Sequence, residues 1–423
     1  MMSSVLRGII AVALCLAIPH AACPYSFQTH EQLVDLTWTD TIEPLLKRRF
    51  PNVSEANLLV AHGYAYGGSA IQDLGYYPFG NEFFSDLTHY VRSADFVQSL
   101  FRHAQNANEL AFAIGALSHY IGDTIGHPGL INPAVAIEFP DLRKKFGPSV
   151  SYAQNHHAHV RTEFAFDVNE ASKHHLAPSA YLRHAGLSIP YRLLAESFAE
   201  TYGLELRPVL GRRRPVIRGY RFAVRSLLPR VAYAEVVLHR DGFPPQPTTS
   251  AAKMFEAQLD RTRLAMAWNQ FRQKPGIKTY LLAALIAILP KLTKLSELAI
   301  RGPDDSTLER YLQTVNRSTS SMREVLGRVD GDLQLPNLDL DTGDPVKPGA
   351  YPLGDQTYAR LLDEITRSSN RNIPSTLKKN ILEYYADPSA PITTKKHRKH
   401  WERVQTDLAL LQSMGTRSNA PQK

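Results

Sequence analysis

The stretch Leu117-Ser-His-Tyr-Ile-Gly-Asp-Thr-Ile-Gly-His-Pro128 places His119, Asp123 and His127 at successive four-residue steps. Residues four apart lie on one face of a helix, so an imidazole, a carboxylate and a second imidazole form a line along that face. The two oxygens of the central carboxylate can bridge two metal ions while the flanking imidazoles bind different ions. The alternative is a polar helix face with surface histidines.

The residues around this line indicate a core helix over residues 104–126. Residues 111–117 are almost wholly apolar, and Ile121 and Ile125 lie between the polar positions. Buried histidines and carboxylates need partners, which favours a metal site. Short spacings also occur by chance, so this stretch alone leaves both interpretations open.

The composition is that of a globular protein with a substantial core. The chain has 423 residues, of which 43% are hydrophobic and 21% charged. Its formal net charge of +8 favours anionic partners such as phosphate esters, anionic lipid surfaces or nucleic acid. The charge does not choose among these partners.

The N-terminus predicts a secretory signal peptide at residues 1–22. A positively charged start is followed by an apolar run at 8–18 and a small-residue exit at 19–22. Cleavage before Cys23 places the protein outside the cell, in the periplasm or in the cell envelope, and a lipoprotein signal would make Cys23 a lipid anchor. Because Cys15 leaves with the signal, the mature chain has no internal disulfide.

The remaining sequence predicts an all-α protein, a multi-helix bundle with a helical C-terminal extension. Helical periodicity over 29–50 and 155–168 continues through most of 178–268, without internal repeats or alternating strand patterns. We expect a catalytic domain at 23–177, a helical extension at 178–412 that joins the same fold or caps it, and a disordered tail at 413–423.

Two further segments have open interpretations. The apolar run at 280–289, flanked by lysines, is too short to span a bilayer and predicts a buried helix or a helix resting on a lipid surface. The loop at 330–348 contains Asp339, Asp341 and Asp344, which suggests calcium, but it lacks the full twelve-residue ligand pattern.

Residues of the ligand type concentrate before residue 170. Five imidazoles and three carboxylates without thiolates are typical of catalytic zinc rather than of closed structural zinc sites. One tetrahedral ion cannot use eight ligands, so the set suits roughly two to three ions with water completing the shells. The candidates are His30, Asp73, His89, His119, Asp123, His127, His159 and Glu163.

Taken in order, these motifs resemble the zinc-dependent phospholipase C family. That family includes the bacterial phosphatidylcholine-hydrolysing enzymes and the N-terminal domain of glycosylphosphatidylinositol-specific phospholipase D, and the single-strand-specific zinc nucleases are related. The matching features follow the order of the chain. They are His30 near the expected mature N-terminus, Asp73 after a Gly-rich loop, His89 one helix later, the motif His119-x-x-x-Asp123-x-x-x-His127 and the motif His159-x-x-x-Glu163. The bacterial enzymes separate the last Asp and His of the longer motif by five residues; the gap of three here matches the phospholipase D branch.

The resemblance implies an all-α fold and a three-zinc centre. It assigns Asp73, His89, His119 and Asp123 to the first ion, His127, His159 and Glu163 to the second, and Asp123, His30 and the amino and carbonyl groups of Cys23 to the third. Lipidation of Cys23 would block that amino group. Asp123 would bridge two ions, and Asp73 would act as a general base or orient the attacking water.

We therefore expect a secreted zinc-dependent phosphodiesterase that hydrolyses phospholipids, or another phosphate diester, by a metal-bound hydroxide. The sequence allows membrane-surface contact and shows no specific protein partner. The alternatives are a zinc nuclease acting on single-stranded nucleic acid and a non-catalytic envelope protein with structural metals. Aromatic residues between 64 and 84 are core residues, or they hold a choline-like head group or stack on a nucleobase.

Overall fold

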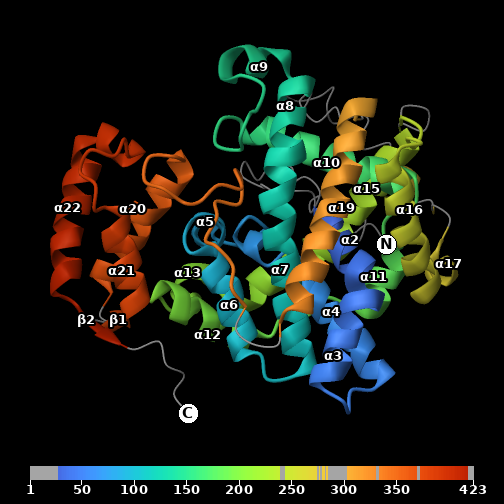
Figure 1. The fold of residues 1–423 in the computed structure, drawn as a ribbon, viewed down its shortest axis with the longest axis horizontal. Helices are drawn as coiled ribbons and strands as arrows, with labels where there is room; N and C mark the ends of the chain where they lie inside the picture. Colours follow the sequence, from blue (N-terminus) through green and yellow to red (C-terminus); the bar gives the residue numbers. More distant parts are fainter. Residues whose placement is uncertain are drawn as a thin grey trace.

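The computed structural model describes residues 27–238, 243–273, 276, 279–281, 283, 303–329, 333–368 and 372–417. The expected signal peptide, Cys23 and most of the apolar run at 280–289 lie outside these residues. Within them the regular secondary structure is helical apart from two three-residue strands, which confirms the all-α prediction (Figure 1). None of the described helices is long and apolar enough to cross a membrane.

The first half of the chain forms the helices that carry the candidate ligands. They are α2 (Phe27–Thr37), α3 (Glu43–Arg49), α4 (Glu55–Ser69), α5 (Glu82–Tyr90), α6 (Ser93–His103), α7 (Ala107–Gly126), α8 (Asn132–Glu138), α9 (Pro140–Phe146) and α10 (His156–Ser172), with the π-turns η1 (Trp38–Ile42) and η3 (His127–Ile131) and the 3₁₀ turn η2 (Gln72–Gly75). We expected one helix over 29–50. The helix runs from Phe27 to Arg49, with the π-helical segment η1 inside it just before Pro44, which lacks the N–H that a regular α-helix needs.

The second half continues in helices. They are α11 (Ser179–Ala185), α12 (Tyr191–Tyr202), α13 (Leu206–Leu210), α14 (Arg213–Phe222), α15 (Leu228–Leu238), α16 (Ser250–Ala265), α17 (Trp268–Phe271), α19 (Asp305–Gly327), α20 (Pro352–Arg367), α21 (Ser375–Tyr384) and α22 (Arg398–Ser413), with the π-turn η4 (Ala223–Leu227) and the 3₁₀ turn η6 (Thr393–Lys396). The last three α-helices gather at one end of the molecule (Figure 1).

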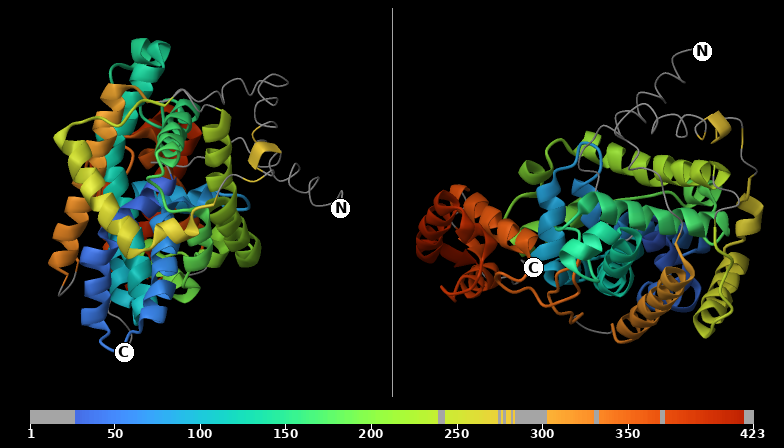
Figure 2. Two further views of the ribbon diagram at one scale, coloured as in Figure 1. Left: turned by 90° about the vertical axis from the view of Figure 1, so that its right-hand side faces the viewer. Right: turned by 90° about the horizontal axis from the view of Figure 1, so that it is seen from above.

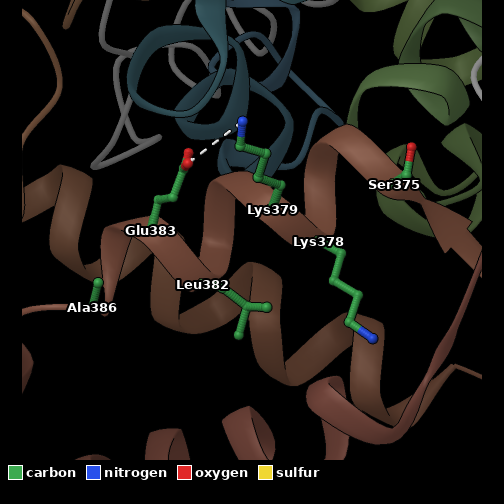
Figure 3. Close-up of a pocket in the computed structure, with 6 residues that line it drawn as sticks. All are labelled: Ser375, Lys378, Lys379, Leu382, Glu383 and Ala386. Atoms are coloured by element: carbon green, nitrogen blue, oxygen red, sulfur yellow. Dashed lines mark ion pairs between the residues drawn. The ribbon is translucent and has the colours of Figure 1, made fainter.

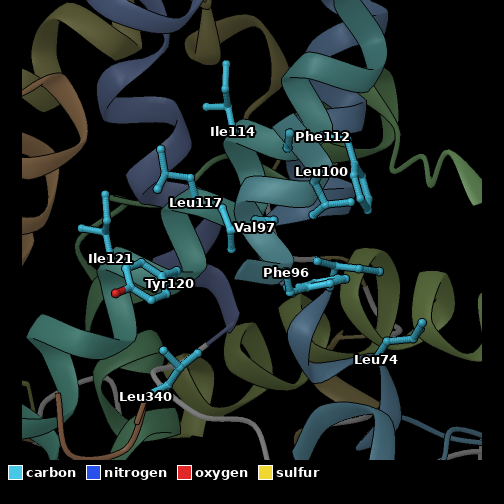
Figure 4. Close-up of a cluster of buried hydrophobic side chains, with 14 of the residues drawn as sticks. Leu74, Phe96, Val97, Leu100, Phe112, Ile114, Leu117, Tyr120, Ile121 and Leu340 are labelled. Carbon is cyan, nitrogen blue, oxygen red and sulfur yellow. The ribbon is translucent and has the colours of Figure 1, made fainter. Parts of the chain in front are cut away.

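Helix α7 lies at the centre of the fold. Asn106 caps its N-terminus by accepting the backbone N–H of Glu109. Glycines bring α7 into backbone contact with α4, since a Cβ added to Gly115 would lie 2.1 Å from the Ala65 carbonyl oxygen. Apolar side chains of α7 then fill the core together with those of α6 (Figure 4). The candidate ligands at the C-terminal end of α7 are thereby held by a rigid element.

The C-terminal half packs against the first half. Tyr311 of α19 stacks on Phe166 of α10 with ring centroids 5.4 Å apart, and its hydroxyl donates to Gln32 of α2 at 2.9 Å. Leu340, from the loop before α20, is buried in the same hydrophobic core as Tyr120 and Ile121 (Figure 4). Elements on both sides of residue 178 therefore share one hydrophobic core.

The expected disorder from residue 413 is wrong for the first residues of the tail. Strand β2 (Gly415–Arg417) pairs in parallel with β1 (Asn372–Pro374). The Lys378 ammonium also donates to the carbonyl oxygens of Gln412 and Met414, at 2.9 and 2.7 Å. Backbone pairing and these two bonds hold the segment, and neither partner is evident from its local sequence.

Candidate metal centre

The four-residue steps on α7 bring two imidazoles to one carboxylate, as the sequence predicts. Nε2 of His119 lies 3.0 Å from Oδ2 of Asp123, and Nε2 of His127 lies 3.7 Å from Oδ1 of the same residue. All three side chains are completely buried. His127 opens the π-turn η3, so the helix widens at the last residue of the motif, just before Pro128.

Asp73 and His89 join this line from η2 and α5. Oδ1 of Asp73 lies 3.4 Å from Nε2 of His89 and 3.9 Å from Nε2 of His119. The two imidazole nitrogens are themselves 3.4 Å apart. One ligand atom from each of these three residues lies within 4.8 Å of the other two, which is a geometry that can hold a metal ion.

His30 of α2 completes a second group with His119 and Asp123. Its Nε2 lies 3.3 Å from Oδ1 of Asp123, and its ring stacks on that of His119 with centroids 4.2 Å apart. The three ligand atoms again lie within 4.8 Å of one another. Gly122 makes room for this approach, because a Cβ there would lie 3.1 Å from Nδ1 of His30.

His159 and Glu163 of α10 face His127 from the other side. Oε1 of Glu163 lies 3.8 Å from Nε2 of His127 and 2.6 Å from Nδ1 of His159. The rings of the two histidines meet edge to face with centroids 5.1 Å apart. The structure therefore brings the eight predicted ligands together in three adjoining groups, of which the first two share His119, while His127 of the third contacts Asp123 of the second. Whether they bind metal stays a prediction.

Three histidines are oriented by their outer nitrogens. Nδ1 of His89 donates to the Ser85 carbonyl at 2.7 Å, and Nδ1 of His119 donates to the Ser69 carbonyl at 3.0 Å. Nε2 of His159 lies 2.8 Å from Oδ1 of Asn132. Since each oxygen is an acceptor, each outer nitrogen donates the proton of its hydrogen bond, and the inner nitrogen faces the centre. Such an arrangement is typical of metal-binding histidines.

The charges at the centre also fit a cation. Burial raises the pKa of Asp73 well above its usual value, and among the described residues neither of its oxygens accepts a hydrogen bond. Burial, together with the charge of His119, lowers the pKa of His30 to about 4, and burial lowers that of His159 to about 3. These imidazoles are neutral at neutral pH, which is the form that binds zinc. A buried carboxylate that accepts no hydrogen bond needs positive charge beside it.

Asp123 behaves differently from Asp73. Burial alone would raise the pKa of Asp123, but the imidazoles of His119, His127 and His30 around it outweigh burial and hold the pKa well below its usual value. Asp123 is therefore ionised in the protein, as a carboxylate that bridges two ions must be.

Sequence reasoning missed one residue at this centre. Oδ1 of Asp341 lies 3.4 Å from Nδ1 of His127, and its other oxygen accepts the hydroxyls of Tyr90 at 2.9 Å and Tyr351 at 2.6 Å. Asp341 is buried, and Asn132 donates to its carbonyl at 2.8 Å. In the sequence, the loop at 330–348 stands out only by the spacing of its aspartates, which suggests calcium. No local signal connects that loop to His127.

The contacts of this loop do not favour calcium. Oδ1 of Asp339 accepts the backbone N–H groups of Asp341 and Thr342, both at 3.0 Å, and so closes a turn. Asp344 is exposed at the surface. The loop also reaches α5, where Leu340 donates its backbone N–H to the His89 carbonyl at 3.2 Å. Its carboxylates therefore shape the loop and hold His127.

A surface hollow on α21 is unrelated to this centre. Six residues line it, and Lys379 and Glu383 form an ion pair of 3.7 Å along its rim (Figure 3). None of the eight candidate ligands lines it. The predicted contribution of Cys23 lies outside the described residues.

Comparison with known proteins identifies a match for the first half of the chain. Residues 29–210 match the family model described as zinc dependent phospholipase C. Neither a curated protein nor a solved structure matches the chain. The matched segment contains all eight candidate ligands and ends with α13, whereas Asp341 lies beyond it.

Proposed function

We propose that this phospholipase C-like hydrolase, whose residues 29–210 match the zinc-dependent phospholipase C family, is a secreted or envelope enzyme that hydrolyses phospholipids with zinc-activated water. The observation that supports this most is the convergence of inward-facing imidazole nitrogens on Asp73 and Asp123. Secretion is proposed from the signal-like sequence at residues 1–22.

The residues suit roughly two to three zinc ions. Asp73, His89, His119 and Asp123 would hold one ion, His127, His159 and Glu163 a second, and Asp123 and His30 with the amino and carbonyl groups of Cys23 a third. When bound, zinc lowers the pKa of water to about 7 and offsets negative charge on phosphoryl oxygens. A lipidated Cys23 would lack the free amino group, and mass spectrometry of the mature N-terminus distinguishes the two forms.

The side chains of this centre position the reacting groups. Asp123 contacts imidazoles from α2, α5 and α7, so it fixes the separation of the ligand groups. Asp73 lies on η2. We propose that its carboxylate orients the attacking water and accepts a proton from that water. His89 and His119 stay correctly oriented because their outer nitrogens are bonded to backbone carbonyls.

The competing function is the same centre acting on single-stranded nucleic acid. Hydrolysis of dispersed phosphatidylcholine and of single-stranded DNA by the same zinc-loaded preparation decides between them. We expect lipid turnover to dominate. Turnover of DNA without lipid turnover would move the chain to the nuclease branch, and turnover of neither with zinc bound would support structural metals.

The Asp123→Asn variant tests the bridge directly. Because the amide cannot supply a charged bridging oxygen, we expect zinc content and turnover to fall together. Asp344→Asn, on the exposed part of the 333–346 loop, is the matched control and should keep both. Retained zinc with full turnover in Asp123→Asn would contradict the bridge assignment.

A further inference from the structure

Arginine is concentrated in one segment that follows the candidate ligands in the sequence. Residues 206–234 contain eight arginines and no acidic residue, whereas the whole chain has a net charge of +8. This segment comprises α13, α14, η4 and most of α15. Its last three elements form one long yellow-green helix along the upper edge of the right-hand view in Figure 2.

The arginines of α14 lie on its solvent face. Arg214, Arg218 and Arg221 are exposed and follow one another at steps of four and three residues, so they form a single stripe, with Arg212 exposed before the helix. The opposite face is fixed in the protein, since Val216, Gly219 and Tyr220 are buried and the Tyr220 hydroxyl donates to the Gly67 carbonyl at 3.0 Å. The stripe is therefore held in place.

Two exposed aromatic rings accompany the stripe. Phe222 follows Arg221 and is 41% exposed, and Phe79 is 73% exposed. The edge of the Phe79 ring faces α14, where a Cβ on Gly219 would lie 3.1 Å from Cδ2 of Phe79. Phe79 also adopts φ of 70°, in the left-handed region that large side chains rarely occupy. An apolar side chain held outward in a strained conformation is more consistent with an interaction role than with packing.

The segment from Asp73 to Phe79 connects this surface to the candidate metal centre. Phe79 follows the ligand Asp73 by six positions, and Tyr77 between them meets Tyr220 of α14 edge to face, with centroids 5.3 Å apart. A partner that contacts Phe79 therefore approaches the segment that carries Asp73.

We propose that Arg212, Arg214, Arg218 and Arg221, with Phe79 and Phe222, form a docking surface for an anionic lipid bilayer. We name these six residues the arginine surface. Guanidinium groups attract the negative charge of acidic head groups, and the two rings enter the boundary between head groups and acyl chains. The rings favour a bilayer over nucleic acid, because a purely electrostatic contact with phosphates needs no protruding apolar side chains. The inference rests on the proposed phospholipase function, which places the substrate in a membrane.

Vesicle co-sedimentation tests the proposal on the full mature chain. The triple variant Arg214→Gln, Arg218→Gln and Arg221→Gln should bind phosphatidylserine-rich vesicles about a hundredfold more weakly than the wild type, since each arginine near an anionic surface contributes about fivefold. Phe79→Asn should lower binding by about tenfold, because the lost ring no longer enters the bilayer. Asn tolerates the left-handed backbone, so the loop should keep its shape.

A second triple variant supplies the control. Lys396→Gln, Arg398→Gln and Lys399→Gln removes the same charge from exposed positions in η6 and at the start of α22, and should bind vesicles like the wild type. Equal binding by the arginine triple and the wild type would overturn the proposal. So would a preference of the wild type for single-stranded DNA over the vesicles that depends on the same arginines.

Turnover of a short-chain phosphatidylcholine that is dispersed as monomers separates docking from catalysis. The arginine triple should hydrolyse this soluble substrate like the wild type, because none of the three side chains belongs to the metal centre. If the wild type failed to hydrolyse it while vesicle binding stayed arginine-dependent, the phospholipase function would fall and the docking surface would stand.

Discussion

Oδ1 of Asp341 lies 3.4 Å from Nδ1 of His127, although the two residues come from opposite halves of the chain. Burial would lower the pKa of His127, but the charges of Asp123 and Asp341 outweigh it and raise that pKa. Asp341 is itself held by the hydroxyls of Tyr90 and Tyr351. The C-terminal half thus supplies a carboxylate that orients a candidate ligand, outside the segment that matches the family.

We predict that Asp341→Asn weakens zinc binding by about 10- to 100-fold, the usual effect of losing a carboxylate that orients a ligating histidine. Competition with a chromophoric chelator measures the affinity. Asp344→Asn, in the same loop but exposed, should bind zinc like the wild type. Unchanged affinity in Asp341→Asn would mean that the carboxylate only shapes the loop.

The contact between α4 and α7 gives a prediction about stability. A Cβ on Gly115 would lie 2.1 Å from the Ala65 carbonyl oxygen, a backbone atom that cannot move alone. We expect Gly115→Ala to lower stability by about 3 kcal/mol or more, measured as a drop in the thermal midpoint. Gly354→Ala, on α20 where a Cβ meets nothing within 4 Å, should be neutral or slightly stabilising. Equal midpoints for both variants would contradict the close helix crossing.

His175 should make stability depend on pH. Its Nδ1 lies 2.9 Å from Glu170 and its Nε2 lies 3.2 Å from Glu256. Burial would lower its pKa, but the two glutamates raise it from 6.5 to about 9. A raised folded-state pKa stabilises the protein fully below pH 6.5, and this contribution, at most about 3 kcal/mol, is lost as pH rises through 9.

Thermal midpoints across this pH range check the contribution of His175. The midpoint of the wild type should fall as the pH rises, and that of His175→Gln should fall less. His184→Gln, at an exposed histidine, is the matched control and should follow the wild type. A parallel decline in His175→Gln and the wild type would contradict the assignment.

The helical elements and most of the candidate centre were predictable because their signals are local. The four-residue spacings of His119, Asp123 and His127 on α7, and of His159 and Glu163 on α10, are set by helix geometry alone. The order of the remaining motifs came from the family resemblance rather than from spacing. The departure from regular α-helix at η1 could have been foreseen from Pro44.

What was missed depends on contacts between distant segments. Asp341 reaches His127 only because Leu340 enters the core and the loop bonds to α5, and no period in the sequence encodes that path. The strand at Gly415–Arg417 likewise needs a partner that lies before α21. The arginine surface was visible as composition, but its alignment with Phe79 required the fold.

Zinc content per chain, measured by elemental analysis of the protein purified under zinc-replete conditions, tests the central claim most directly. The eight converging side chains predict roughly two to three zinc ions per chain in the wild type. A chain that retains no zinc under these conditions would contradict the metal centre and, with it, the proposed hydrolysis of phospholipids.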